Sequence, residues 1–179
     1  MTEVGTGVLL LLFLFAAVFT DIRERRIPNA LTGAGLATGL LLAMLLPQGV
    51  GLKASLLGAL TGLACFLPMY AFRAMGAGDV KLMAMSGAFL GPLDTFESVL
   101  WVLLAGGVLA LLFALRRGVL RKVLGNVRTL FYSAAASVQL HNMPDFSDAP
   151  SSAKLPYAVA IASGMAVFMA MREMGVSLL

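Results

Sequence analysis

The sequence predicts an all-α integral membrane protein with about six transmembrane helices and a further amphipathic helix on the cytoplasmic surface. Hydrophobic residues make up 60% of the 179 residues and charged residues only 12%, whereas soluble domains hold about 45–50% and about 25%. A chain of this size cannot bury so much apolar surface, because a domain of about 150 residues still exposes nearly a third of its unfolded surface. At about 20 apolar residues per crossing, there is room for roughly six helices. We therefore expect a single membrane-embedded domain over residues 1–179.

The first half of the chain contains three apolar runs. The run from Val4 to Thr20 lacks the basic start and the small-residue cleavage site of a signal peptide, so we expect a retained first helix. A polar turn over residues 21–29 follows it, and Pro28 suits a helix start. The second helix is then expected over about residues 30–46 and the third over about residues 54–72.

Three further helices are expected in the second half. After a glycine-containing junction, the fourth covers about residues 80–90, which is short for a full crossing. Gly91-Pro92 ends it, which places Asp94 in a solvated loop. The fifth helix is expected over about residues 99–115 and the sixth over about residues 155–171.

Glycine spacing predicts where these helices pack closely. In three of the predicted helices, two glycines stand four residues apart. Such pairs allow helix backbones to approach in lipid. The pairs are Gly35/Gly39, Gly58/Gly62 and Gly87/Gly91.

The positive charges predict the orientation. If the connections after the first, third and fifth helices lie on one side, that side holds 11 of the 13 Lys and Arg residues, and the other side holds only Lys53 and Arg172. The side richer in positive charge faces the cytoplasm. The amino terminus is therefore expected outside, and a model with five or seven helices would lose this segregation.

The longest connection, about residues 116–154, has its own pattern. Apolar residues recur at helical spacing over residues 116–140, with Arg and Lys among them. This pattern is typical of an amphipathic helix on the cytoplasmic leaflet, attracted to anionic lipid. It either anchors the chain or guides a substrate. Because the membrane explains the basic residues, no nucleic-acid partner is expected.

Two aspartates at the membrane edge are the candidate catalytic residues, since ionisable groups at membrane depth usually have a function. Asp21 ends the first helix and Asp79 begins the fourth, and their separation of 58 positions leaves room for one helix out and one back. Both carboxylates therefore reach the same face at similar depth. Such a pair shares a proton, and aspartic proteases use it to activate water and to polarise an amide carbonyl.

Two glycines precede Asp79 in the sequence Gly-Ala-Gly-Asp. Gly76 and Gly78 permit positive φ angles and close approach of a substrate backbone. Structural roles remain an alternative, because Asp21 could pair with a neighbouring arginine and Asp79 could cap the fourth helix.

The sequence offers few residues for a disulfide, a metal site or another catalytic mechanism. One cysteine, Cys65, and one histidine, His141, exclude an intrachain disulfide and the common zinc motifs, so no metal or other cofactor is expected. Cys65 is expected to be a packing residue and His141 a solvated loop residue. Ser86 and Lys81 are five residues apart on one helix and face different sides, which argues against a serine–lysine dyad.

Around the aspartates, the sequence resembles the type IV prepilin peptidases, membrane aspartyl proteases with a Gly-x-Gly-Asp motif. Residues 21–29, Asp-Ile-Arg-Glu-Arg-Arg-Ile-Pro-Asn, match the family's aspartate followed by Ile-Pro-Asn. Residues 76–82, Gly-Ala-Gly-Asp-Val-Lys-Leu, match Gly-x-Gly-Asp-x-Lys-Leu. Residues 154–160 resemble the start of the last helix in the short members. The chain is similar to the compact form that serves tight-adherence (Flp) pili and lacks the cysteine-containing methyltransferase region.

The resemblance implies a multi-pass protein of the bacterial inner membrane that cleaves prepilin or pseudopilin leader peptides at the cytoplasmic face, just after a glycine. Asp21 and Asp79 would be the catalytic pair. Motif positions with a substrate-binding role carry over to Gly76, Gly78, Lys81, Pro28 and Asn29. Two other functions stay open: a small proton- or ion-coupled carrier with two membrane aspartates, and a non-catalytic membrane protein of pilus assembly.

Overall fold

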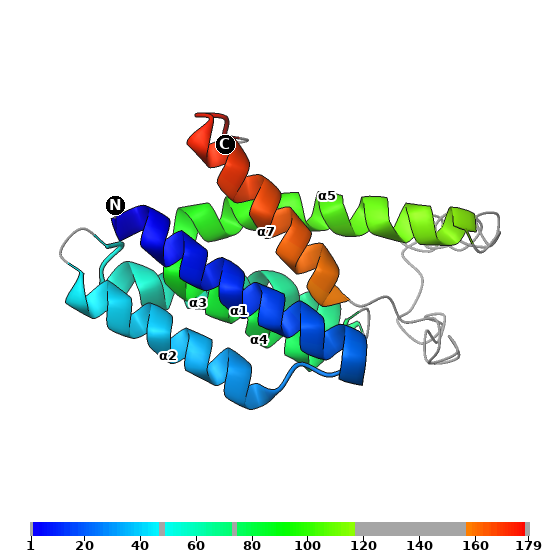
Figure 1. Cartoon of the computed structure of the whole chain (residues 1–179), viewed down its shortest axis with the longest axis horizontal. Coiled ribbons are helices and arrows are strands. Elements are labelled where there is room, and N and C mark those ends of the chain that lie inside the picture. The colour runs from blue at the N-terminus through cyan, green and yellow to red at the C-terminus, as the bar shows by residue number, and fades with distance from the viewer. Residues whose placement is uncertain (1, 47–48, 73–74, 117–156, 178–179) are drawn as a thin grey trace, which may run out of the picture. The chain divides into compact units, whose positions relative to one another are not determined.

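The computed structural model describes residues 2–46, 49–72, 75–116 and 157–177 (Figure 1). Within these residues the chain forms six α-helices and no strand, so the all-α prediction is confirmed for the described part. The helices are α1 (Thr2–Glu24), α2 (Asn29–Leu45), α3 (Leu52–Ala71), α4 (Ala77–Leu90), α5 (Pro92–Arg116) and α7 (Tyr157–Glu173).

The chain divides into two compact units. One comprises residues 1–106 and 156–179, and the other comprises residues 107–155. The contacts described below all lie within the first unit. Of the second, the structure describes only the carboxyl-terminal part of α5, and the predicted amphipathic helix beyond residue 116 lies outside the described residues.

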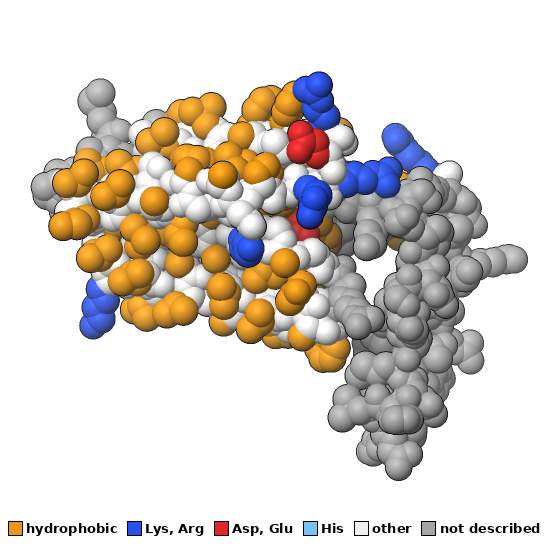
Figure 2. Space-filling view, turned by 90° about the horizontal axis from the view of Figure 1, so that it is seen from below, with side chains coloured by type: hydrophobic (Ala, Val, Ile, Leu, Met, Phe, Trp, Pro, Cys, Tyr) orange, Lys and Arg blue, Asp and Glu red, His pale blue; other side chains and the backbone are white. Residues whose placement is uncertain are grey.

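Three helices are long and apolar enough to cross a membrane. They contain the stretches Gly5–Glu24, Leu52–Ala71 and Pro92–Phe113, and α2 is a shorter apolar helix. Many of their large side chains point outward: Phe15 is 71% exposed and Leu60 is 61% exposed. Figure 2 shows hydrophobic side chains over much of the visible face. Contact with lipid would remove this apolar surface from water.

Helix α4 lies at the centre of the first unit, and ten of its 14 residues are buried. Glycines let it approach α3 at the backbone level. A Cβ atom on Gly58 would collide with the carbonyl oxygen of Gly87, and one on Gly62 would lie 2.5 Å from the carbonyl oxygen of Met83. Nearby, the Ser55 hydroxyl of α3 donates a 2.6 Å hydrogen bond to a carbonyl oxygen of α4. The expected close packing at these glycines is confirmed.

The other face of α4 packs against α2. A Cβ atom on Gly35 would collide with the Met85 side chain, and one on Gly39 would lie 3.1 Å from Ala88 and Phe89. Gly35 and Gly39 form the small-residue face of α2, so close packing is present at this predicted pair as well. At the pair Gly87/Gly91 only Gly87 packs closely, because a Cβ atom on Gly91 would meet nothing nearer than 3.7 Å. Two helices thus approach α4 through glycine.

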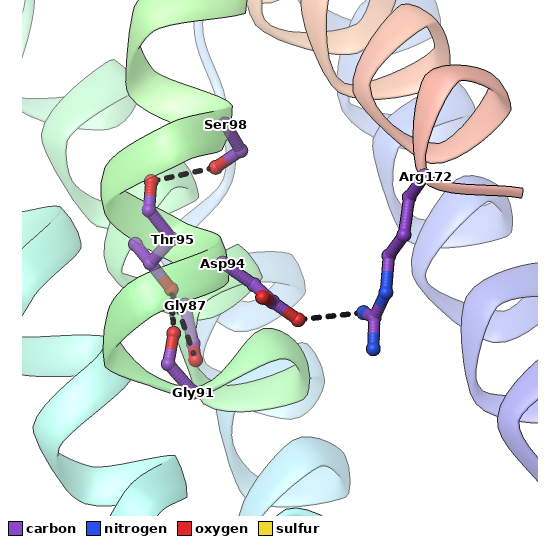
Figure 3. Close-up of polar contacts among 6 residues, drawn as sticks. All are labelled: Gly87, Gly91, Asp94, Thr95, Ser98 and Arg172. Atoms are coloured by element: carbon purple, nitrogen blue, oxygen red, sulfur yellow. Dashed lines mark hydrogen bonds and ion pairs between the residues drawn. The ribbon is translucent and has the colours of Figure 1, made fainter. Parts of the chain in front are cut away.

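The predicted end of the fourth helix at residue 90 is confirmed, but the predicted start of the fifth helix was wrong. Helix α4 begins at Ala77 and α5 begins at Pro92, seven residues before the predicted start. Gly91 alone makes the break with a φ of +82°, a left-handed conformation that suits glycine, and proline is favoured at a first helical position. Asp94 therefore lies in α5 rather than in a loop, where its carboxylate pairs with Arg172 of α7 at 2.6 Å (Figure 3).

The start of α5 is tied to the end of α4 by buried hydroxyl groups. Thr95 donates to the carbonyl oxygens of Gly91 and Gly87, and Ser98 donates to the carbonyl oxygen of Thr95 (Figure 3). These intramolecular partners satisfy polar groups that would be costly to bury unpaired. The turn at Gly91 is therefore held at a fixed place.

Candidate active site

Asp21 lies in the last turns of α1 and contacts the first turn of α7. Its Oδ2 atom accepts a 3.4 Å hydrogen bond from the backbone N–H of Ala158. The helix ends just beyond it, at Arg25, which has a left-handed φ of 53° and donates its N–H to the carbonyl oxygen of Asp21. The amino-terminal N–H groups of a helix are donors without a partner inside the helix, so the first turn of α7 can orient the Asp21 carboxylate.

Asp79 is the third residue of α4 and is only 8% exposed. Its Oδ2 atom accepts a 3.1 Å hydrogen bond from the backbone N–H of Gly76, the residue that precedes the helix. This bond is the half of a capping box in which a side chain reaches back to the N-cap residue. The structural role foreseen for Asp79 is therefore present, and it fixes the carboxylate in one orientation.

The two carboxylates influence each other electrostatically. Asp79 lies outside the three candidate spans. Burial, and to a lesser extent the negative charge of Asp21, raise the pKa of Asp79 to about 6 against the lowering effect of the Gly76 hydrogen bond. An aspartate near neutral pKa beside a second carboxylate is the arrangement in which a pair holds one proton between them.

Gly78 brings the first motif against the second. A Cβ atom on Gly78 would lie 3.2 Å from Cβ of Ile27, so the glycine makes room for the isoleucine. Neither motif glycine uses the positive φ angle that glycine permits: Gly76 has a φ of −81°, and Gly78 is not among the described residues with positive φ. Close packing, rather than an unusual backbone conformation, is what the structure shows at Gly78.

A polar contact joins the two motifs a second time. The Lys81 ammonium donates a 2.8 Å hydrogen bond to the Oδ1 atom of Asn29, although the residues are 52 positions apart. Asn29 is the first residue of α2, and Pro28 precedes it in an extended conformation. Four predicted motif positions, Pro28, Asn29, Gly78 and Lys81, thus lie where the start of α2 meets the start of α4.

The first turn of α7 was not among the predicted site residues. Besides the N–H of Ala158, it contributes Tyr157, whose hydroxyl oxygen would lie 3.2 Å from a Cβ atom on Gly106 of α5. Burial raises the pKa of Tyr157, and the charge of Asp79 raises it further. The only signal in the sequence was the third motif, residues 154–160, of which residues 157–160 are described.

The alternative nucleophiles are not arranged for catalysis. Ser86 is fully buried and donates to the carbonyl oxygen of Leu82, whereas Lys81 is exposed, so the two face different sides as predicted. Cys65 is a free thiol that packs against the core. Within the described ranges no three His, Cys, Asp or Glu side chains are grouped to hold a metal ion. His141 lies outside those ranges.

A comparison with protein families agrees with the site. The model of the type IV leader peptidase family matches residues 8–115, which is more than half of the chain and includes both aspartates. No curated protein and no solved structure matches the chain. The aspartate motifs, the helices that bring them together and the family match lead to one conclusion: this chain belongs to the type IV leader peptidase family.

Proposed function

We propose that this protein is an aspartyl endopeptidase that cleaves the leader peptides of prepilins or pseudopilins, with Asp21 and Asp79 as its catalytic pair. One observation carries the proposal: two aspartates from separate helices lie within electrostatic reach of each other, and each accepts a backbone N–H. Those two hydrogen bonds orient both carboxylates before any substrate arrives.

The chemistry follows from the shared proton. The ionised carboxylate takes a proton from a water molecule as that water attacks the scissile carbonyl. The protonated carboxyl group donates a hydrogen bond to the carbonyl oxygen, which stabilises the negative charge that develops there. When the C–N bond of the resulting tetrahedral intermediate breaks, the carboxyl group that took the proton from water donates a proton to the leaving amine. The proton belongs to the pair, so the pH dependence describes both residues together.

We further propose that the site faces the cytoplasm of a bacterial inner membrane, in a chain that crosses six times with its amino terminus outside. The support is the distribution of charge. Arg23 lies two residues after Asp21 on α1, and Lys81 lies two residues after Asp79 on α4. Lys53, near the start of α3, and Arg172, near the end of α7, lie on the other side of the membrane in this topology. Figure 2 shows charged side chains gathered mainly at one end of the visible face. Positive residues are retained on the cytoplasmic side and attract anionic lipid.

The test is cleavage of a leader-bearing prepilin that is expressed together with this chain. The wild type should convert the precursor to the shorter product, and both Asp21→Asn and Asp79→Asn should abolish conversion. Asp94→Asn is the matched control, because Asp94 pairs with Arg172 rather than with the site, and it should cleave as well as the wild type.

Persistent cleavage by both asparagine variants would overturn the aspartyl mechanism. A carrier would give a different result in the same preparations. Reconstituted in liposomes, it would conduct protons or ions in a manner dependent on the aspartates, and it would leave the precursor uncut.

A further inference from the structure

An open apolar groove of about 530 Å³ runs between α1 and α7. Six residues of α1, from Val8 to Val18, form one wall, and three residues of α7, from Val159 to Ser163, form the other. Every one of them except Ser163 is apolar. The groove therefore offers contact area but almost no hydrogen-bonding groups to its occupant.

One end of the groove reaches the candidate active site. Val18 lies one helical turn before Asp21 on α1. On α7, Val159 directly follows Ala158, whose N–H donates to the Asp21 carboxylate. The walls of the groove thus end within one helical turn of the two groups that form this hydrogen bond.

The α1 wall of the groove is long enough to support a helix, while the α7 wall covers about one helical turn beside the site. Val8 and Val18 are ten residues apart, which corresponds to about 15 Å along α1, or nearly three helical turns. The groove is formed partly by the small residues Ala162 and Ser163, which let another helix backbone approach closely in lipid. Large side chains such as Leu12 and Phe15, 59% and 71% exposed, stand on the α1 side.

We infer that this groove docks the apolar membrane helix that adjoins the scissile bond of the substrate, and that it delivers the bond to Asp21. The inference rests on the proposed function. A lipid chain would cover the same surface, but nothing would require its groove to end at a catalytic carboxylate. A substrate helix has that requirement, because the bond to be cut must reach the aspartates, and the polar leader must continue beyond the apolar walls.

The first experiment fills the groove. Ser163 is exposed, so Ser163→Leu adds bulk there without forcing a side chain into the core. The probe is a synthetic precursor with a basic leader that ends in glycine, followed by about 20 apolar residues, enough for one crossing. We expect its KM to rise about ten-fold, the order of discrimination that one misfit group gives in an apolar site, with kcat retained. A short peptide that lacks the apolar segment should keep its KM.

The matched control is Ala37→Leu, which adds the same side chain at an exposed position of α2 that is not part of the groove. It should leave both kinetic parameters unchanged. An equal rise of KM for Ala37→Leu, or a rise for the short peptide as well, would overturn the groove as the docking surface.

The second experiment identifies the occupant directly. A photo-cross-linking residue is placed at Leu12 in the groove or at Leu60 on α3, positions with nearly equal exposure of 59% and 61%. Asp79→Asn is included so that the precursor stays uncut. Adducts with the apolar segment of the precursor are expected from position 12 and not from position 60.

Adducts from position 12 with lipid only, or with this chain's own residues 117–156, would overturn the inference. These outcomes are distinct from failure of the proposed function. If the wild type never cuts the precursor, the peptidase proposal fails; if it cuts but Ser163→Leu and position 12 behave as the controls do, only the docking inference fails.

Discussion

The two aspartates are supported by helix pairs of opposite character. Asp79 starts α4, which touches α3 through the glycine backbone at Gly58 and Gly62. Asp21 ends α1, which meets α7 alongside a groove of about 530 Å³. Glycines bring the backbones of α3 and α4 together and leave no space between them. Helices α1 and α7 leave a groove, with large side chains on the α1 wall and the small residues Ala162 and Ser163 on the α7 wall. The comparison indicates that one half of the site is a fixed support and the other half is open to a partner.

The largest effect on stability is expected from a substitution that places a side chain between α3 and α4. In Gly87→Val the new Cβ would collide with the carbonyl oxygen of Gly58. Overpacking of this kind costs about 3 kcal/mol and sometimes more, so we expect loss of folded protein together with activity. Thermal unfolding in detergent, followed by the fluorescence of Trp101, measures the change.

The control is a glycine in open space. A Cβ on Gly33 of α2 would meet nothing within 4 Å, so Gly33→Ala should stabilise the chain slightly through its helix propensity. If Gly87→Val unfolds at the same temperature as the wild type, the α3–α4 pair is not the fixed support described above.

The second prediction concerns the buried charge on the fixed side. The pKa of Asp79 is about 6 in the folded chain, above the ordinary value of 3.8, because its carboxyl is buried. The folded state therefore binds a proton more tightly than the unfolded state, and stability falls as the pH rises from about 4 to about 6 and is level above that. Asp79→Asn removes this dependence. Its advantage in free energy of unfolding over the wild type should grow across that interval to at most about 3 kcal/mol.

Thermal unfolding of both proteins at several pH values between 4 and 7 checks this. Asp94→Asn serves as the reference, since its carboxylate is paired with Arg172 away from the site. A difference between Asp79→Asn and the wild type that stays constant with pH would contradict the raised pKa.

A smaller effect on stability is expected from loss of the hydrogen bond between the start of α2 and the start of α4. Lys81→Met keeps the apolar stem of the lysine but loses the hydrogen bond to Asn29, and Asn29→Ala loses the same bond from the other side. Both partners are exposed, so their coupling should be about 1 kcal/mol in a double-mutant cycle of unfolding free energies. Strictly additive losses would show that the contact does not hold the two motifs together.

The smallest effect on stability is expected from loss of the ion pair near the carboxyl-terminal end of α7. Asp94 and Arg172 form an ion pair at 2.6 Å, with side chains 31% and 50% exposed (Figure 3). Such pairs contribute less than about 1 kcal/mol and weaken with salt. A double-mutant cycle with Asp94→Asn and Arg172→Gln should give a coupling of this size that declines in high salt, with cleavage unchanged. A coupling of several kcal/mol would mean that α7 is fixed at both ends.

Much of the fold could be predicted because membrane helices are apolar runs of a required length. The ranges of α1, α2, α3 and α7 lie within a few residues of their predictions, and the predicted family is confirmed by the match over residues 8–115. Gly91-Pro92 correctly predicted a break between the fourth and fifth helices. The sequence does not distinguish the predicted break of eight residues from the observed break of one residue. The missing information was the left-handed φ of Gly91 together with the hydroxyl bonds of Thr95.

The site contacts were harder to predict for a different reason. The donor to Asp21 is a backbone N–H, which nearly every residue carries, so nothing in the side chain of Ala158 identifies it. The bond between Lys81 and Asn29 joins positions 52 apart, and each residue alone is an ordinary polar group. Roles that depend on the fold become visible only when the fold is known.

The glycine contacts of α3 and α4 have a consequence for how this chain tolerates mutation. Gly58 and Gly62 face backbone atoms of the neighbouring helix, and backbone atoms are the same whatever side chains surround them. In a random mutant library scored for folded protein, lipid-facing positions such as Leu60 should therefore accept many apolar residues. Positions 58, 62 and 87 should accept almost none but glycine, so the residues with the least chemistry are expected to be the least replaceable.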